Sequence, residues 1–366
     1  MGIKPLQGVR VLSIEHFGAA PYGTMFLASL GADVVRIENA AAGGDPARRT
    51  GPHLLGASDS EYFQSWNLGK RSISLDLKHE RPRLEGLVKS ADALVNNLRG
   101  DLPAKLGLDY ASLAPINPAL VCVHLSAYGR DNERAAWPGY DFLMQAEAGL
   151  MSLTGEPDGP PARYGTSIID CMAGMTAAAA LLACLLRARA TGKGCDVDTS
   201  LFEVALHQLG YAATWYLNEG DAAARLPRSA HLSLVPVQTY PTADGWIFVM
   251  CMTDRFWDTL TELLGRADLQ RDARFATQAA RLEHRGALSD VLDSEFRRQP
   301  TAFWLERLSG KVPVAPVNDV AQALENPFVQ KIGMVRTAPH PQRPDFRVLA
   351  SPVRIDGERP QPKVCE

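Results

Sequence analysis

The sequence lacks several features that would each assign a class of protein. Its 366 residues include six cysteines, but no CxxC pair, which argues against a zinc or iron–sulfur site. Phosphate-loop GxxxxGK[ST], nucleophile-elbow GxSxG and zinc-protease HExxH patterns are also absent. The formal net charge of −3 argues against a general nucleic-acid-binding surface. We therefore expect no metal and no nucleic-acid partner.

Long apolar runs are also scarce. The first 15 residues contain no signal-peptide core, and the longest uncharged apolar run, 171–186, is shorter than the ~20 residues that a membrane span needs. We read this run as part of a buried helix. Scattered cysteines in apolar surroundings suit reduced thiols, so we expect a cytoplasmic protein without a membrane segment.

The first 130 residues alternate between strand and helix patterns. Short apolar, β-branched runs alternate with segments of helical spacing, which predicts an α/β fold with a parallel sheet covered on both faces. The predicted strands are 9–14, 33–38, 71–77, 91–97 and 119–129, and the predicted helices are 22–31, about 80–90 and 102–106. Residues 40–64 lack periodicity and predict a long loop.

The remaining chain predicts a second, smaller domain. A long helix at 168–190 is followed by a strand at 195–201 and a helix at about 200–217. A strand at 245–252 and helices at 254–264, 281–296 and 301–309 indicate an α+β module. We divide the chain into a large domain at 1–217, a linker at 218–236, a small domain at 237–311 and a return to the large domain at 312–366.

One acid stands at the head of the long apolar helix. Asp170 lies three residues after Ser167, the spacing of a capping box, and a carboxylate there also complements the helix dipole. The same carboxylate, ionised at pH 7 by its reference pKa of ~3.9, could attack a thioester without a partner base. By geometry alone the cap is favoured.

Several cations fall near the ends of predicted strands, where parallel sheets bind ligands. They could meet a ligand with several phosphates, or they could be ordinary surface charges. They are Arg36, Arg48, Arg49, Lys70, Arg71, Arg99 and Lys105. The backbone N–H groups of "GAAPYG" at 18–23 could also hold a phosphate, although the glycine spacing does not fit a dinucleotide fingerprint.

Six ordered blocks resemble the family III CoA-transferases, which include formyl-CoA and dicarboxylate CoA-transferases and α-methylacyl-CoA racemases. The blocks begin with "PLQGVRVLSIEHFGAAPYGTMFLASLGADVVRIE" and "WNLGKRSISLDLK". They continue through "ADALVNNLRGDLPAKLGLDY", "PGYDFLMQAEAGLMSLTGEPDGPPARYGTSIIDCMAGM", "ARATGKGCDVDTSLFEVAL" and "YPTADGWIFV". The similarity covers nearly the whole chain.

This resemblance implies that Asp170 is a covalent nucleophile. In the family's transferases this aspartate attacks the donor acyl-CoA and forms a mixed anhydride. The freed CoA thiolate then leaves a CoA thioester on the aspartate, and the acceptor acid repeats the steps in reverse. We therefore expect CoA transfer from an acyl-CoA such as succinyl-CoA to a free carboxylic acid, with no permanently bound cofactor.

The family's racemases use a second base, a histidine in a "GHD" stretch. Here that stretch reads Gly139-Tyr140-Asp141, and a phenol with an ordinary pKa of ~10 is a poor base at pH 7. The racemase is the disfavoured alternative, with His124 as a conceivable substitute base. A non-catalytic acyl-CoA-binding relative is a third reading, against which the retained Asp170 argues.

The resemblance also implies binding residues and an assembly. The positions that match the family's CoA contacts are Phe17, Arg36, Asn97, Leu98, Leu102, Lys105, Leu106 and Tyr128. Tyr140 and His231 are weaker candidates for substrate contacts. The family's fold is a Rossmann-like large domain with a small α+β domain, and two chains interlock as a homodimer. "RLPRSAHLSLVPV" at 225–237 has no glycine, in contrast to the glycine-rich flap of some members.

Overall fold

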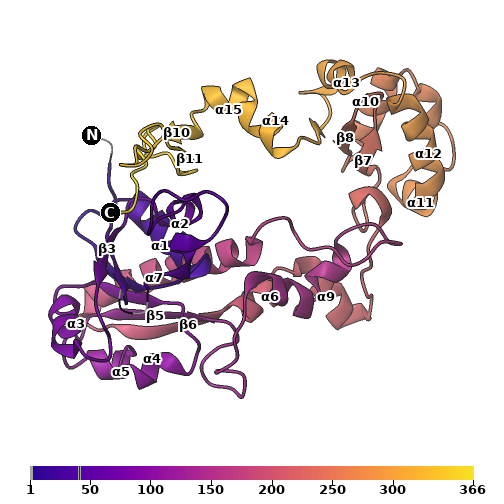
Figure 1. The fold of residues 1–366 in the computed structure, drawn as a ribbon. Helices are drawn as coiled ribbons and strands as arrows, with labels where there is room; N and C mark the ends of the chain where they lie inside the picture. Colours follow the sequence, from indigo (N-terminus) through magenta and orange to yellow (C-terminus); the bar gives the residue numbers. More distant parts are fainter. Residues whose placement is uncertain (1–2, 40, 42) are drawn as a thin grey trace. The chain divides into compact units, whose positions relative to one another are not determined.

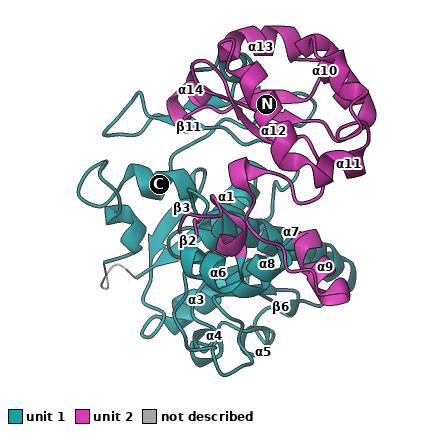
Figure 2. Ribbon diagram, turned by 90° about the vertical axis from the view of Figure 1, so that its right-hand side faces the viewer, with its two compact units in different colours: residues 1–149, 164–209, 326–366 teal, residues 150–163, 210–325 magenta. Residues whose placement is uncertain are grey.

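The computed structural model describes residues 3–39, 41 and 43–366. The chain divides into two compact units (Figures 1 and 2). Unit 1 is Met1–Gly149, Tyr164–Leu209 and Asn326–Glu366, and unit 2 is Leu150–Arg163 and Gly210–Glu325. These boundaries differ from the predicted ones in two ways. Residues 150–163 and the helix at 210–219, which we predicted in the large domain, belong to unit 2, and the chain returns to unit 1 at 326 and not at 312.

Unit 1 is built on a six-stranded sheet in the order β3-β2-β1-β4-β5-β6, and every neighbouring pair is parallel. The strands are β1 (Arg10–Ile14), β2 (Asp33–Glu38), β3 (Arg71–Ser74), β4 (Ala93–Asn96), β5 (Val121–Ser126) and β6 (Cys195–Ser200). The central strands are buried, as parallel strands covered on both faces must be. The order reverses between β1 and β4, so the loops that follow these two strands diverge there and leave room for a ligand.

Two helices of unit 1 pack through their backbones. α1 (Ala19–Ser29) lies against α7 (Ile168–Thr191), and a Cβ added to Gly23 would lie 2.2 Å from the carbonyl oxygen of Gly174. A Cβ on Gly174 would in turn lie 2.3 Å from the carbonyl oxygen of Ala19. Only glycine permits this approach, which sets the position of the first turn of α7 beside the start of α1.

The remaining elements of unit 1 surround this core. They are the 3-10 segment η2 (Pro46–Arg49), the helices α2 (Glu61–Asn67), α3 (Arg81–Val88), α4 (Leu102–Lys105), α5 (Tyr110–Leu113), α6 (Asp141–Glu147), α8 (Leu201–His207) and α15 (Pro327–Lys331), and the antiparallel pair β10 (Val335–Thr337) and β11 (Arg347–Leu349). The predicted loop at 40–64 thus contains helical structure, and its end forms α2 because Ser60 caps that helix.

Unit 2 has its own sheet and core. β7 (Val237–Pro241), β8 (Trp246–Met250) and β9 (Val314–Pro316) form an antiparallel sheet. The segments around it are η3 (Leu150–Leu153), α9 (Gly210–Glu219), η4 (Pro227–Ser229), α10 (Asp254–Leu264), η5 (Ala267–Gln270), α11 (Gln278–Glu283), α12 (Arg285–Phe296), α13 (Thr301–Leu308) and α14 (Val320–Glu325). Aromatic side chains such as Trp257, Phe275 and Phe296 fill the core.

Three predicted helices differ from the structure. The helix predicted at 200–217 is two helices, α8 and α9, separated where Gly210 adopts a φ of 54°. The helix predicted at 281–296 is α11 and α12, which meet at His284. α7 is not buried on all sides, because Leu186 is 73% exposed. Among the described residues it is the one helix that is long and apolar enough to cross a membrane, but core helices of soluble proteins meet the same criterion.

Candidate active site

The loop after β1 is held in an unusual conformation. Phe17 has a φ of 56°, which a bulky residue adopts only when its surroundings enforce it. Its N–H donates to Oδ1 of Asp45 at 3.3 Å. On the other side, the Asn97 side chain accepts from the His16 N–H at 2.9 Å and donates to the His16 carbonyl at 2.8 Å. The loops after β1 and β4 are therefore joined at the point where the strand order reverses.

The side chain of Asp170, a residue of α7, lies beside the start of α1. A Cβ added to Gly18 would lie 2.6 Å from Oδ2 of Asp170, so this carboxylate occupies the space that any other residue at position 18 would fill. The first N–H groups of α1 have no acceptor within their own helix. The glycine contacts between α1 and α7 thus bring a carboxylate to a helix N-terminus at the switch point of the sheet.

The predicted capping box at Ser167 is wrong. The Ser167 side chain makes no capping hydrogen bond, and the Asp170 N–H instead donates to Oδ2 of Asp141 at 2.9 Å. Asp141 is buried, and its Oδ1 accepts from the Gln145 side chain, whose own oxygen accepts from the Tyr164 N–H at 2.8 Å. A carboxylate from α6 therefore caps α7, which frees the side chain of Asp170 from that task.

The prediction that Asp170 is already fully ionised at pH 7 is also wrong. Burial, and second the negative charge of Asp141, raise the pKa of Asp170 from 3.8 to about 7. Burial penalises the charged form, and a second carboxylate repels it. At neutral pH the group is therefore divided between the acid and the carboxylate.

Two aromatic residues, Phe17 and Tyr140, directly precede Gly18 and Asp141, the residues that contact Asp170. Phe17 meets Tyr140 edge-on, with ring centroids 6.1 Å apart, and Tyr140 is 60% exposed. Burial, and then the charges of Asp170 and Asp45, raise the pKa of Tyr62. The charge of Asp170 thus acts on the Tyr62 hydroxyl, while Phe17 and Tyr140 pack against each other.

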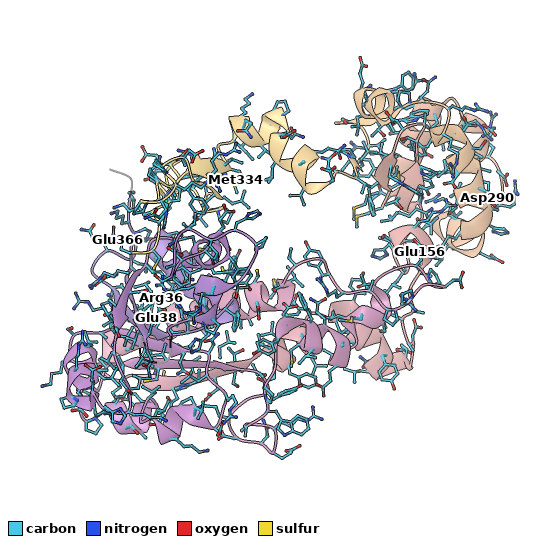
Figure 3. All side chains as sticks on the ribbon, viewed as in Figure 1. Arg36, Glu38, Glu156, Asp290, Met334 and Glu366 are labelled. Atoms are coloured by element: carbon cyan, nitrogen blue, oxygen red, sulfur yellow. The ribbon has the colours of Figure 1, made fainter. Side chains whose placement is uncertain are left out.

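The structure corrects the role predicted for Arg36. This residue of β2 is fully buried, and its guanidinium pairs with Asp45 at 2.8 Å, with Glu38 at 3.0 Å and with Glu15 at 3.3 Å. Figure 3 labels Arg36 together with Glu38 of the same strand. It has no exposed donor for a phosphate. Because Asp45 also binds the Phe17 N–H, Arg36 instead supports the β1–α1 loop.

Lys70 and Arg48 belong to the same buried network. Lys70 Nζ lies 2.7 Å from Oε1 of Glu15, and burial lowers the pKa of Lys70 to about 8. Arg48 pairs with Glu38 at 2.7 Å. Burial raises the pKa of Glu38, but the hydrogen bond with Arg48 and the charge of Arg36 outweigh burial and lower it to about 2. Six charges of balanced sign are thus sequestered beneath the loop, so neither cation is available as the phosphate contact that the sequence suggested.

The other predicted CoA contacts gather after β4 and β5. Leu98 and Leu106 pack partly against the core of unit 1, and Leu102 begins α4. Lys105 is exposed, and its Nζ lies 2.8 Å from Asp101. Tyr128 donates from its hydroxyl to Glu147 at 2.7 Å.

Two histidines have structural partners. His124 in β5 is 1% exposed, with Nδ1 2.8 Å from Asn96 and Nε2 2.8 Å from Asp196. It is held as a structural residue and does not present a free base. His231 lies in unit 2, where Nδ1 accepts from the N–H groups of Ser233 and Leu234, and burial lowers its pKa.

Sequence reasoning missed Gly18 and Asp141. A glycine before a helix, or an acid in "GYD", does not by itself indicate a functional site. Asp170, which both residues contact, is 29 or more residues away in the chain. Within the described residues, no group of three or more His, Cys, Asp or Glu side chains is arranged to hold a metal ion.

Comparison with protein families shows which family the chain belongs to. A model described as CoA-transferase family III matches residues 6–364. The chain belongs to this family. As a family member with CoA-transferases among its relatives, it is an enzyme that uses CoA thioesters.

Individual relatives are similar over almost the whole chain. A succinate–glutarate CoA-transferase of Agrobacterium fabrum is 33% identical, over 99% of this chain and 93% of that protein. An acetyl-CoA:oxalate CoA-transferase of Acetobacter aceti is 34% identical over 99% and 93%. A solved CAIB/BAIF family protein of Brucella suis has 33% identity and a TM-score of 0.83, and covers 98% of this chain and 94% of that chain.

Proposed function

We propose that this CoA-transferase moves CoA from a short acyl-CoA, such as succinyl-CoA, to a free carboxylic acid through covalent intermediates on Asp170. The observation that carries the proposal is the placement of the Asp170 carboxylate beside Gly18, at the N-terminus of α1. Relatives named for succinate, glutarate and oxalate support a small mono- or dicarboxylic acid as the partner substrate.

In this mechanism the carboxylate of Asp170 attacks the thioester carbonyl and expels the CoA thiolate, which leaves a mixed anhydride. The thiolate then attacks the carbonyl carbon of Asp170, releases the donor acid and leaves an aspartyl-CoA thioester. The acceptor carboxylate attacks this thioester and again frees the thiolate. Attack of the thiolate on the acceptor's carbonyl yields the new acyl-CoA and restores the carboxylate.

The surrounding residues suit this chemistry. The first N–H groups of α1 can stabilise negative charge that develops near Asp170. Asp141 fixes the backbone of Asp170. We propose that Phe17, Asn97, Leu98, Leu102, Lys105, Leu106 and Tyr128 line the CoA site, with Lys105 as a phosphate contact and Asn97 acting by joining the two loops. Tyr140 and His231 remain proposed substrate contacts.

The wider assignments are also proposals. The strand order 3-2-1-4-5-6 is that of doubly wound dinucleotide-binding sheets, which supports a Rossmann-like large domain. We propose a cytoplasmic homodimer with no permanently bound cofactor and no nucleic-acid or membrane partner.

Racemisation is the less favoured function. It requires a second base opposite Asp170, and Tyr140 stands at the position of the racemase histidine. His124 is fixed by Asn96 and Asp196, which removes it as a substitute.

The test is to trap the covalent intermediate. The protein is incubated with succinyl-CoA, quenched with hydroxylamine and mapped by peptide mass spectrometry, and a hydroxamate is expected on Asp170. Asp170→Asn should carry none. Asp141→Asn keeps the nucleophile and removes only the negative charge beside it, so this variant should still be labelled at Asp170.

An unmodified Asp170 with succinyl-CoA and with other short acyl-CoAs, from a folded protein, would contradict the proposed mechanism. Deuterium incorporation at the α-carbon of a 2-methylacyl-CoA would then support the racemase instead.

A further inference from the structure

Three arginines of unit 1 converge near its C-terminal segment, away from Asp170. Nη2 of Arg354 and Nε of Arg359 both donate to the carbonyl oxygen of Ile332, at 2.6 and 3.4 Å. Nε of Arg336 donates to the next carbonyl, that of Gly333, at 3.2 Å. Because two guanidinium groups share one acceptor and the third uses its neighbour, three positive charges are held close together.

This cluster lacks a counter-charge. Within the described residues, no carboxylate forms an ion pair with Arg336, Arg354 or Arg359, and their hydrogen bonds go to backbone carbonyls, including that of Ser351. Burial, and then the charges of Arg354 and Arg336, lower the pKa of Arg359. Like charges at this separation repel one another, and carbonyl dipoles offset only part of that repulsion.

The cluster faces a large cavity. A space of about 1330 Å³ is lined by these three arginines, by residues of α1 between Tyr22 and Ser29, and by the tail of the chain. Lys4, Arg347, Lys331 and Lys363 also line it, against the two carboxylates of Glu61 and Glu358. A concave surface with this excess of positive charge attracts anions.

The three arginines lie at the end of the cavity that is remote from the proposed nucleophile. Its α1 residues run from Tyr22 to Ser29, whereas Gly18, which contacts Asp170, precedes the helix. Arg359 donates to the carbonyl of Ser351, and the Ser351 hydroxyl bonds to that of Ser29 at the C-terminal end of α1. The eleven residues of α1 span ~16 Å, so the cluster lies at the opposite end of this helix from Gly18.

We propose that Arg336, Arg354 and Arg359 form a binding site for a small oxyanion that carries two or more negative charges, of the phosphate-ester type. Guanidinium groups present paired N–H donors that match the oxygens of such anions, and each arginine here has donors left over from its carbonyl bonds. The bound anion supplies the counter-charge that the cluster lacks.

The test is titration calorimetry on the full chain with pyrophosphate, in low salt and without phosphate buffer. We expect saturable binding that weakens by at least about tenfold in Arg354→Gln/Arg359→Gln, because two charge-assisted contacts are lost. Arg347→Gln is the matched control. It lines the same cavity but shares no carbonyl with the cluster, and it should change affinity by less than about twofold.

Absence of saturable binding, or an equal loss in the Arg347→Gln control, would overturn the proposal. Competition by free CoA would identify its phosphates as the source of the anion, and competition by citrate alone would point to a tricarboxylate. If the double variant instead changes the sedimenting mass without pyrophosphate binding to either protein, the arginines meet an acidic part of a second copy and the proposed site is wrong.

Discussion

At the scale of single residues, Asp170 is subject to opposing influences. The starts of α1 and α7 favour its ionised form, because helix N-termini stabilise negative charge. Burial and the charge of Asp141 oppose ionisation, and the net result is a pKa of about 7. A partly desolvated carboxylate with this pKa is a stronger nucleophile than an ordinary aspartate once it is ionised.

The pH dependence of acylation should follow this ionisation. Only the carboxylate attacks, so the single-turnover rate of hydroxamate formation should rise by about tenfold per pH unit below 7 and level off above it. Asp141→Asn removes a repelling charge and should move the midpoint to lower pH. Identical midpoints in the two proteins would contradict the proposed influence of Asp141.

The stability of the fold should depend on the same ionisation in the opposite direction, because the ionised form reacts but destabilises the folded state. A carboxyl group whose folded pKa is raised contributes stability below its unfolded pKa and loses it as the pH rises through about 7. Asp170→Asn cannot ionise. At pH 8 it should therefore unfold in urea with a free energy higher than that of wild type by at least about 1 kcal/mol, the equivalent of one pKa unit. This advantage should shrink at pH 5, and an advantage independent of pH would show another cause.

Gly18→Ala should remove activity while preserving the fold. The added Cβ would meet Oδ2 of Asp170 at 2.6 Å and displace the carboxylate, and a displacement of this size costs on the order of 10²-fold in rate. Steady-state kinetics with succinyl-CoA measure it. Gly86→Ala in α3 has open space around the new Cβ and should leave the rate unchanged. Equal rates for both variants would refute the close contact.

At the scale of elements, the position of the nucleophile depends on the contact between α1 and α7. Their backbones meet through Gly23 and Gly174, whereas the buried network of Glu15, Arg36 and Lys70 holds the loop that leads into α1. The first contact aligns the two helix starts, and the second fixes Phe17 in its left-handed conformation.

Gly23→Ala should therefore affect both stability and catalysis. Its Cβ would lie 2.2 Å from a backbone oxygen, so the helices must separate, which costs about 1–3 kcal/mol by the usual range for overpacking. Urea unfolding and the acylation rate should both fall. Unchanged stability would show that α1 and α7 are not in backbone contact.

At the scale of the whole molecule, the chain contains two independent cores. Leu94 is buried in unit 1 and Leu292 in unit 2, each within a separate cluster of apolar side chains. Separate cores allow separate cooperative transitions, so we expect the unfolding free energies predicted above for variants of unit 1 to describe the transition of that unit.

Calorimetry should resolve these cores. Leu292→Ala should lower the transition of unit 2 by an amount equivalent to about 2–5 kcal/mol, and the matched variant Leu94→Ala should lower that of unit 1. Each variant should leave the other transition largely in place. A single transition that both variants lower equally would show that the units unfold together.

Local patterns predicted many elements well. β2 and α10 have the predicted bounds, because a run of apolar residues in the first and helical spacing after a threonine cap in the second are complete signals within a few residues. The patterns failed at the break between α8 and α9 and in the region 40–64, where helices are short and depend on capping and tertiary contacts.

The sequence by itself determined the alternation of strands and helices, the family blocks and the candidacy of Asp170, since each is written in neighbouring residues. Only the tertiary structure decided that Asp141 caps α7, that Arg36 and Lys70 are buried, and that Asp170 sits beside Gly18 with a raised pKa. The physical reason is that burial and charge–charge interactions depend on distances between residues far apart in the chain, and only the packing of α1 on α7 and the order of the parallel strands set those distances.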